Sequence, residues 1–253
     1  ALEIPANFQT GISIPALQSA LADWPVKAVV LMANFSNPTG ATLSDGNKKA
    51  IVELCSELDV AVIENDIYGE LHHGLERPRA LKSYDVQGQV LYCNSLSKSV
   101  SPSLRLGWIS PGKWLAQAEY LQFTSSLATS PLAQHAVLEY LKSGFHRRHV
   151  RQLSQRFKHQ TRQFRYAIVD QFPAGTAISQ PEGGFVLWIE LPEKFDTEVV
   201  YFQAIKKGIT VAPGTMFSSA DSYKNCLRIN CGLPWSARIA ESLASIGELL
   251  KQQ

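Results

Sequence analysis

The chain has 253 residues, with 24 basic and 22 acidic side chains and a formal net charge of +2. This near-balance argues against a dedicated nucleic-acid binder, which usually carries a basic excess, and against an acidic disordered tail. With 45% hydrophobic and 18% charged residues, the chain can bury a substantial core in one large or two medium domains.

The cysteine and histidine patterns predict neither disulfides nor a metal site. No pair of cysteines has the C-x-x-C spacing, and no histidine pair has a metal-binding spacing. The longest apolar runs are too short to cross a bilayer, and the N-terminus has no secretory pattern. We therefore expect a cytoplasmic protein with reduced thiols and no membrane partner.

Strand and helix patterns alternate in the first half of the chain. The apolar run from Val26 to Ala33 predicts a buried strand, and the turn-rich residues 34–40 predict a loop. Ser44 suits a helix N-cap. Apolar residues after it have the i, i+3, i+4, i+7 spacing of one buried helical face: Ile51, Leu54, Cys55 and Leu58.

Two more apolar runs predict strands, from Val60 to Ile63 and from Val90 to Cys93. Strands that alternate with helices indicate an α/β fold, with a mainly parallel sheet covered by helices on both faces. Such sheets bind ligands at the carboxyl ends of their strands. We therefore expect the polar residues that follow the three strands to converge at one edge: Asn37, Asp66, Tyr68, Ser95, Ser97 and Lys98.

The second half of the chain is organised differently. Helical patterns cover residues 113–126, 131–142, 146–171 and 236–250. Shorter strand-like pieces, broken by Gly and Pro, cover residues 184–191, 209–212 and 226–231. These patterns predict a domain boundary near residue 144, followed by a smaller α+β domain.

The motif with the most chemical content is Ser95-x-Ser97-Lys98, followed seven residues later by Arg105. Partial desolvation at the end of a buried strand favours the neutral, nucleophilic form of a lysine amine, which suits Schiff-base chemistry. Serine hydroxyls and a guanidinium are suitable donors for a phosphate dianion. Taken alone, the motif is better explained as a solvated loop followed by a structural arginine.

Asp66 and Tyr68 add a second requirement of the same chemistry. A carboxylate at a strand end can pair with a protonated pyridine nitrogen, and a phenol can bond the oxygen substituent of the ring. Taken alone, Asp66 and the segment from Asn37 to Gly40 are also good turn formers. The four motifs in this order are more specific than any one of them.

Together these segments resemble the cofactor motifs of fold-type I, class I/II aminotransferases. The segments in question are residues 36–40 (SNPTG), 64–68 (ENDIY), 95–98 (SLSK) and 102–107 (PSLRLG). Residues 181–185 (PEGGF), 211–217 (VAPGTMF) and 227–230 (LRIN) are similar to the small domain of that family. The resemblance implies that residues 1–143 are the C-terminal part of the large domain, which binds pyridoxal 5′-phosphate (PLP), and that residues 144–253 are the small domain.

The resemblance also implies a role for each residue around the cofactor ring. Lys98 would form the internal aldimine with PLP and then move a proton between the substrate Cα and the cofactor C4′. Asp66 would bind the pyridinium nitrogen. Asn37 and Tyr68 would bind the phenolic oxygen of the ring.

The remaining candidate residues would bind anionic groups. Ser95, Ser97 and Arg105 would hold the cofactor phosphate. Arg228 would bind the α-carboxylate of an amino acid or 2-oxo acid through two parallel hydrogen bonds, a geometry that lysine cannot provide. No metal is implied.

The chain departs from the family pattern before Asn37. In this family a glycine-rich phosphate loop, an aromatic residue that stacks on the pyridine ring and much of the large domain precede the Asn-Pro-Thr-Gly loop, whereas only 36 residues precede Asn37 here. We therefore expect the chain to be the C-terminal part of a longer protein and to purify largely without PLP. The family usually works as a homodimer, so we expect a homodimer of the complete protein.

Within the family, the chain most resembles the MocR-type regulators, in which a GntR-type winged-helix DNA-binding domain lies upstream of an aminotransferase-like domain. We favour a PLP-binding effector domain of this type, with residual transaminase chemistry and with DNA contact only through the upstream domain. The alternative is a fragment of a stand-alone α-aminoadipate or kynurenine aminotransferase. A degenerate scaffold is disfavoured because the set Asp66, Lys98, Arg105 and Arg228 is intact.

A basic stretch lies between His146 and Arg165. It contains seven basic side chains and no acidic one: Arg147, Arg148, Arg151, Arg156, Lys158, Arg162 and Arg165. Apolar residues at helical spacing interrupt it and indicate a buried stripe: Val150, Leu153, Phe157 and Phe164. We therefore expect a solvated basic face on a packed helix, in preference to a surface that contacts DNA phosphates.

Overall fold

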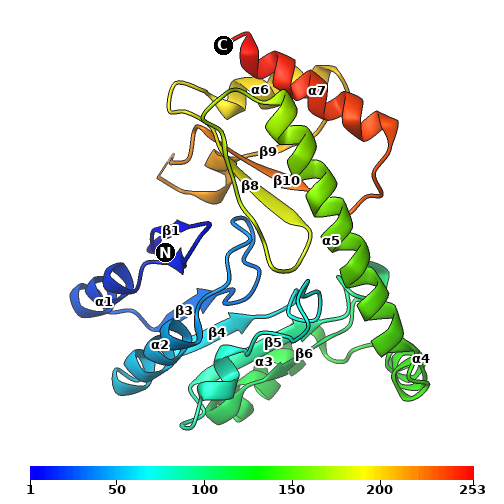
Figure 1. Ribbon diagram of the computed structural model, residues 1–253. Coiled ribbons are helices and arrows are strands. Elements are labelled where there is room, and N and C mark those ends of the chain that lie inside the picture. The colour runs from blue at the N-terminus through cyan, green and yellow to red at the C-terminus, as the bar shows by residue number, and fades with distance from the viewer. Residues whose placement is uncertain (221) are drawn as a thin grey trace.

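The structure is a computed structural model that describes residues 1–220 and 222–253. Two four-stranded sheets, one from each half of the chain, are connected by the long helix α5 (Phe145–Gln171), which runs past both of them (Figure 1). A two-stranded hairpin, β1 (Ala6–Asn7) and β2 (Gly11–Ile12), lies near the N-terminus. The described residues contain no helix that is long and apolar enough to span a membrane.

The first sheet confirms the mainly parallel α/β prediction. Its order is β3-β4-β5-β6, in which β3, β4 and β5 are parallel and β6 is antiparallel to β5. The antiparallel edge strand is not predicted from the sequence. The bounds are β3 (Ala28–Leu31), β4 (Ala61–Asn65), β5 (Val90–Ser95) and β6 (Gly107–Ser110).

Helix α2 (Asp45–Glu57) begins where the sequence predicts. The Ser44 hydroxyl caps it by accepting a hydrogen bond from the Asn47 N–H at 3.2 Å. Ile51 and Cys55 are buried, but Leu58 lies at the C-terminal cap and is 49% exposed, so its predicted place on the buried face is wrong. The helix ends one residue too early for Leu58 to face the sheet.

The sheet is flanked by helices as predicted, but one face of β3 is uncovered among the described residues. Val29 and Leu31 point into the core shared with α2 and with α1 (Ile14–Asp23), a helix that the sequence patterns miss. Val30, on the opposite face, is 70% exposed. Side chains alternate between the two faces of a strand, so this face of β3 has no cover within the described residues.

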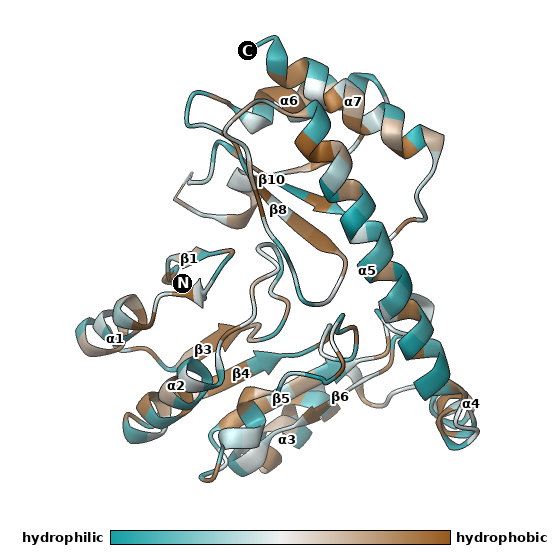
Figure 2. Ribbon diagram, in the orientation of Figure 1, coloured by the Kyte–Doolittle hydropathy of each residue, from teal (hydrophilic) through white to brown (hydrophobic). Residues whose placement is uncertain are grey.

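The second sheet confirms the α+β prediction for the C-terminal part of the chain. All of its neighbouring strands are antiparallel, in the order β7-β8-β10-β9. Its strands are β7 (Ala177–Ile178), β8 (Val186–Glu190), β9 (Ala212–Pro213) and β10 (Cys226–Asn230). The strand predicted over residues 209–212 is therefore mostly loop. Figure 2 shows β8 as a hydrophobic strand, in contrast to the hydrophilic N-terminal half of α5.

Two helices pack on the second sheet, and two more follow the last strand of the first sheet. Helices α6 (Thr197–Lys206) and α7 (Ala237–Lys251) pack on the second sheet around a core that includes the C-terminal half of α5. The sequence patterns predict α7 but miss α6. Helices α3 (Leu115–Ser126) and α4 (Pro131–Lys142) follow β6, close to their predicted positions. Short 3₁₀ turns are η1 (Leu81–Tyr84), η2 (Pro102–Leu104), η3 (Gly112–Trp114) and η4 (Gly214–Phe217).

A small apolar cluster joins the two halves. Phe35, Tyr68 and Leu71 come from loops that follow β3 and β4, and Phe157 comes from α5. Phe185, in the loop before β8, packs against this cluster. This packing holds the candidate site residues of both halves together. The domain boundary at residue 144, directly before α5, stays a prediction.

Candidate active site

The carboxyl ends of the parallel strands bring Asp66 next to the end of β5. In the register of the sheet, Asn65 lies opposite Cys93, and the Asp66 N–H donates to the Cys93 carbonyl at 3.0 Å. Asp66 therefore follows β4 at the level of Asn94 and Ser95. This is the edge at which parallel sheets bind ligands.

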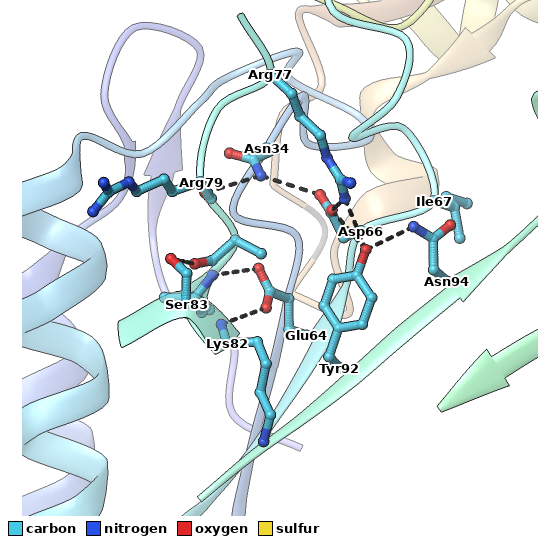
Figure 3. Close-up of polar contacts among 12 residues, drawn as sticks. Asn34, Glu64, Asp66, Ile67, Arg77, Arg79, Lys82, Ser83, Tyr92 and Asn94 are labelled. Atoms are coloured by element: carbon cyan, nitrogen blue, oxygen red, sulfur yellow. Dashed lines mark hydrogen bonds and ion pairs between the residues drawn. The ribbon is translucent and has the colours of Figure 1, made fainter. Parts of the chain in front are cut away.

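The Asp66 carboxylate is 1% exposed and accepts from three protein donors. The Asn34 side chain donates to Oδ1 at 3.1 Å, and the Tyr92 hydroxyl donates to Oδ2 at 3.1 Å. The Arg77 guanidinium forms an ion pair with Oδ2. Figure 3 shows Asp66 at the centre of these three contacts. A buried carboxylate with this many charge-assisted bonds is held in one orientation.

The sequence patterns do not predict these three partners. Asn34 directly follows the first strand, so the rule that identifies Asp66 applies equally to it. Tyr92 lies within β5, where only the strand register shows that its hydroxyl reaches Asp66. Arg77 lies in an irregular loop, and nothing in the spacing of the sequence indicates its contact.

Lys98 lies in a tight turn that begins where β5 ends. The buried Leu96 anchors this turn, because its carbonyl accepts from the N–H groups of Val100 and Ser101 at 2.8 and 3.1 Å. The Leu96 N–H in turn donates to the Leu106 carbonyl at 3.1 Å. The Lys98 side chain is exposed, and no hydrogen bond or ion pair engages its ammonium group in residues 1–220 and 222–253. Its ammonium group is therefore unpaired and accessible, and this exposure differs from the partial desolvation that the sequence predicts.

The pairing of β5 with β6 returns Arg105 toward the same turn. Ser95 lies opposite Gly107, so Arg105 is two residues beyond this pair. A Cβ at Gly107 would lie 2.8 Å from the Asn94 carbonyl, which explains the glycine. Arg105 itself has a left-handed backbone, with φ of 49°, which is unusual for a side chain of this size. Such strain is concentrated at functional sites.

Arg228 connects the second sheet to the loop after β3. Its Nη1 donates to Asn37 Oδ1 at 3.0 Å, and its guanidinium lies 5.2 Å above the Phe217 ring. Its Nε is buried and has no hydrogen-bond partner among the described residues. Arg228 therefore keeps an unused donor.

Tyr68 is buried beside this pair. Its ring contacts Phe185 edge to face, with the centroids 5.2 Å apart. Burial raises the pKa of the Tyr68 hydroxyl, and the positive charge of Arg228 acts in the opposite direction. The structure thus brings Asn37, Tyr68 and Arg228 together. No hydrogen bond or ion pair among the described residues joins them to Lys98 or Arg105.

A second buried carboxylate, Glu64, lies next to the Asp66 cluster (Figure 3). It is 0% exposed and accepts from the N–H groups of Leu81 and Lys82 at 2.7 and 2.9 Å. Burial raises the pKa of Glu64 to about 7, with a smaller contribution from the charge of Asp66. The hydrogen bonds from the Lys82 and Leu81 N–H groups, and to a smaller extent the charge of Lys48, partly offset this rise.

We expect Glu64 to make the stability of the fold depend on pH. Its pKa is raised in the folded state, so its contribution is complete below the ordinary value of 4.5 and is lost as the pH rises through about 7. Between about pH 4.5 and pH 7, the free energy of unfolding should fall relative to that of Glu64→Gln, by about 3 kcal/mol at most. Urea unfolding of both proteins across this range measures the difference. A difference that stays constant with pH contradicts the assignment.

The comparisons with known proteins identify the family. The model of the family "Aminotransferase class I and II" matches residues 4–242, so the chain belongs to that family. The chain is 40% identical over 247 residues to the uncharacterised HTH-type transcriptional regulator YjiR of Escherichia coli (strain K12), covering 98% of this chain and 53% of YjiR. It is 27% identical to the 2-aminoadipate transaminase of Thermus thermophilus, covering 99% of this chain and 64% of that enzyme.

Solved structures confirm the predicted fold-type I aminotransferase fold. The kynurenine aminotransferase of Pyrococcus horikoshii superposes with a TM-score of 0.92 at 28% identity, covering 99% of this chain and 63% of that chain. The α-aminoadipate aminotransferase LysN of Thermus thermophilus, complexed with N-(5′-phosphopyridoxyl)-L-leucine, has a TM-score of 0.89 at 26% identity. LysN is covered over 65% of its length and this chain over 99%. The chain spans about half the length of the regulators that it matches.

Proposed function

We propose that the chain binds PLP at Lys98 and forms the effector part of a MocR-type transcription regulator of the GntR family. The observation that carries this proposal is the free Lys98 ammonium in the turn after β5, which also contains Ser97 and directly follows Ser95, with the strained Arg105 returned toward this turn by the pairing of β5 with β6. An amine without partners, two hydroxyls and a guanidinium match an aldehyde that carries a phosphate. The residues present therefore fit the cofactor.

Each of the other candidate residues has a role in this proposal. Asp66, held by Asn34 and Tyr92, would hold the protonated pyridine nitrogen, and Asn37 and Tyr68 would hold the phenolic oxygen. When bound, PLP withdraws electrons from the substrate Cα. Lys98 would then accept and return the Cα proton as general base and acid.

Arg228 would determine which ligands bind. Its guanidinium has an unused, buried Nε donor and comes from the second sheet, opposite the cofactor residues. A planar guanidinium binds a carboxylate through two parallel hydrogen bonds. We propose an amino acid or a 2-oxo acid as the ligand, held by its α-carboxylate.

The regulator role is supported by the relatives. YjiR and YdcR of Escherichia coli (strain K12), at 40% and 34% identity, are both described as HTH-type transcriptional regulators. We propose that an upstream winged-helix domain contacts the DNA, that the complete protein is a cytoplasmic homodimer, and that ligand binding at Arg228 is the signal. The coding DNA upstream of Ala1 tests this: a winged-helix pattern supports the regulator, and a glycine-rich cofactor half alone supports an aminotransferase.

A second candidate function is a stand-alone amino-acid aminotransferase of the α-aminoadipate or kynurenine type. The likeness to the Thermus 2-aminoadipate transaminase and to the Pyrococcus kynurenine aminotransferase favours it. In that case the chain exchanges an amino group between an amino acid and a 2-oxo acid over many turnovers, whereas a sensor need only bind its ligand.

Spectroscopy with added ligand tests the proposed site and separates the two functions. We expect an amino acid to change the visible absorption of the PLP-loaded chain, and we expect Arg228→Gln to weaken this response at least about tenfold. The exposed Arg238 of α7 provides a matched control as Arg238→Gln, which should respond normally. Sustained formation of 2-oxo acid identifies an aminotransferase. No spectral response in any variant contradicts the site.

A further inference from the structure

A cavity lies on the side of α5, and none of the candidate cofactor residues lines it. Its volume is about 620 Å³, within the range of small-molecule sites. Its walls come from α5, from the loop of residues 72–79 after β4, and from residues 180–182 before β8. It therefore lies between the two halves of the chain.

The α5 wall of this cavity is cationic. Lys158, Arg162 and Arg165 line it, at the i, i+4, i+7 spacing of one helical face. In residues 1–220 and 222–253, none of the three lies within ion-pair distance of a carboxylate. The predicted solvated basic face is thus only part of the arrangement, because these three cations border a cavity.

Two buried donors in the α5 wall have no partner. Thr161 is 4% exposed, and its hydroxyl makes no hydrogen bond among the described residues. The Arg165 Nε is likewise buried and unpaired. An unsatisfied buried donor costs stability, so two of them in the wall of one cavity point to an acceptor supplied from outside the chain.

The opposite wall adds positive charge and apolar contact. Arg79 lines it, with its guanidinium 6.0 Å above the Tyr84 ring, and Arg77 lines it while paired with Asp66. Burial lowers the pKa of His73, which favours the neutral ring. Five cationic side chains border the cavity in total. They outnumber the carboxylates that line it, which are Asp45, Glu76 and Glu182.

We propose that this cavity binds a small organic phosphate at a site separate from the Lys98 turn. The dianionic phosphate group would accept from Arg162, Arg165 and the Thr161 hydroxyl, a donor set that suits phosphate oxygens. The cavity is much larger than one phosphate ion, so it has room for an organic part against Phe35 and Pro181. This site goes beyond the proposed cofactor function and does not depend on it.

Calorimetry with inorganic phosphate tests the proposal, with the 253-residue chain free of PLP and the ionic strength held constant with chloride. We expect the Kd to rise at least about tenfold in Arg162→Gln, because one charge-assisted donor is lost. Thr161→Val should raise the Kd about threefold without lowering the melting temperature, because the hydroxyl has no partner within the chain. A role of Thr161 in the fold alone would lower the melting temperature instead.

Two control variants locate the bound phosphate. Arg156→Gln removes the same charge from an exposed position of α5 outside the cavity and should leave the Kd unchanged. Arg105→Gln removes the candidate cofactor-phosphate donor, so it should weaken phosphate bound at the Lys98 turn of the PLP-free chain and leave the Arg162-dependent binding unchanged. Loss of all phosphate binding in Arg105→Gln, or equal Kd values for Arg162→Gln and Arg156→Gln, overturns the proposal.

The chemical class of the ligand has its own test. Succinate, a dicarboxylate, should bind at least about tenfold more weakly than phosphate, and a short DNA duplex should not compete with phosphate. Equal affinity for succinate overturns the phosphate assignment. If the duplex does compete, and Arg156→Gln and Arg162→Gln weaken this competition equally, α5 carries a DNA-contacting surface instead.

Discussion

Lys98→Ala should abolish the aldimine absorption that we expect the chain to acquire with excess PLP, measured as the difference from the spectrum of free PLP. The reason is chemical: the aldimine requires a covalent bond between the Lys98 Nζ and the cofactor, and alanine has no amine. Excess PLP is needed because we expect the chain to purify largely without the cofactor. Absorption spectra recorded at increasing PLP concentration measure the effect, which should be a complete loss.

Two further variants control this experiment. Lys98→Arg keeps the positive charge but has no nucleophilic amine, so it should lose the absorption just as Lys98→Ala does. Lys251→Ala removes an exposed lysine at the end of α7 and should behave like the unmodified chain. Retained absorption in Lys98→Arg would mean that a different lysine carries the cofactor.

Asp66→Ala should lower the free energy of unfolding by about 2 to 3 kcal/mol in the absence of PLP. The substitution leaves the Tyr92 hydroxyl and the Asn34 amide without their acceptor and breaks the ion pair with Arg77. The value is below the full cost of breaking a buried ion pair because the Arg77 side chain is 41% exposed and partly solvated. Urea unfolding measures the change.

A double-mutant cycle separates the ion pair from the rest of the cluster. Arg77→Met, combined with Asp66→Ala, should show a coupling of about 1 kcal/mol or more, because the two side chains are in direct contact. Asp66→Asn keeps the shape of the side chain and should cost less than alanine. Additive effects of Asp66→Ala and Arg77→Met would contradict the described contact.

The parts of the fold that the sequence predicts are those determined by local chemistry. Ser44 caps α2 and accepts a backbone hydrogen bond, as expected of an N-cap. The three apolar runs become parallel strands, and this explains why Asp66 and Ser95 lie at the same edge. These features depend on residues that are close together in the sequence.

The parts that the sequence does not predict depend on long-range pairing. Strand β6 exists because Gly107 and its neighbours pair with β5, and only this register brings Arg105 back toward Ser95. The contacts of Arg77 with Asp66 and of Arg228 with Asn37 span 11 and 191 residues. No periodic pattern encodes such contacts. The hydrogen bond from Tyr92 to Asp66 likewise follows from the pairing register of β4 and β5, which the sequence does not specify.

The packing of helices on the first sheet is also only partly predicted from the sequence. An alternating pattern of strands and helices predicts helices on both faces, yet Val30 of β3 is exposed and α3 buries no residue among those described. The pattern identifies the class of fold correctly. It does not show which helix packs on which face, because that depends on loop paths that the sequence patterns leave open.

The most direct test of the central claim, that Lys98 is the cofactor lysine, is borohydride reduction of the chain in the presence of PLP, followed by peptide mass spectrometry. The reduction fixes the cofactor on the amine to which it is bound. We predict one phosphopyridoxyl group per chain, on the peptide that contains Lys98. A label spread over exposed lysines, or concentrated on another lysine, would contradict the assignment.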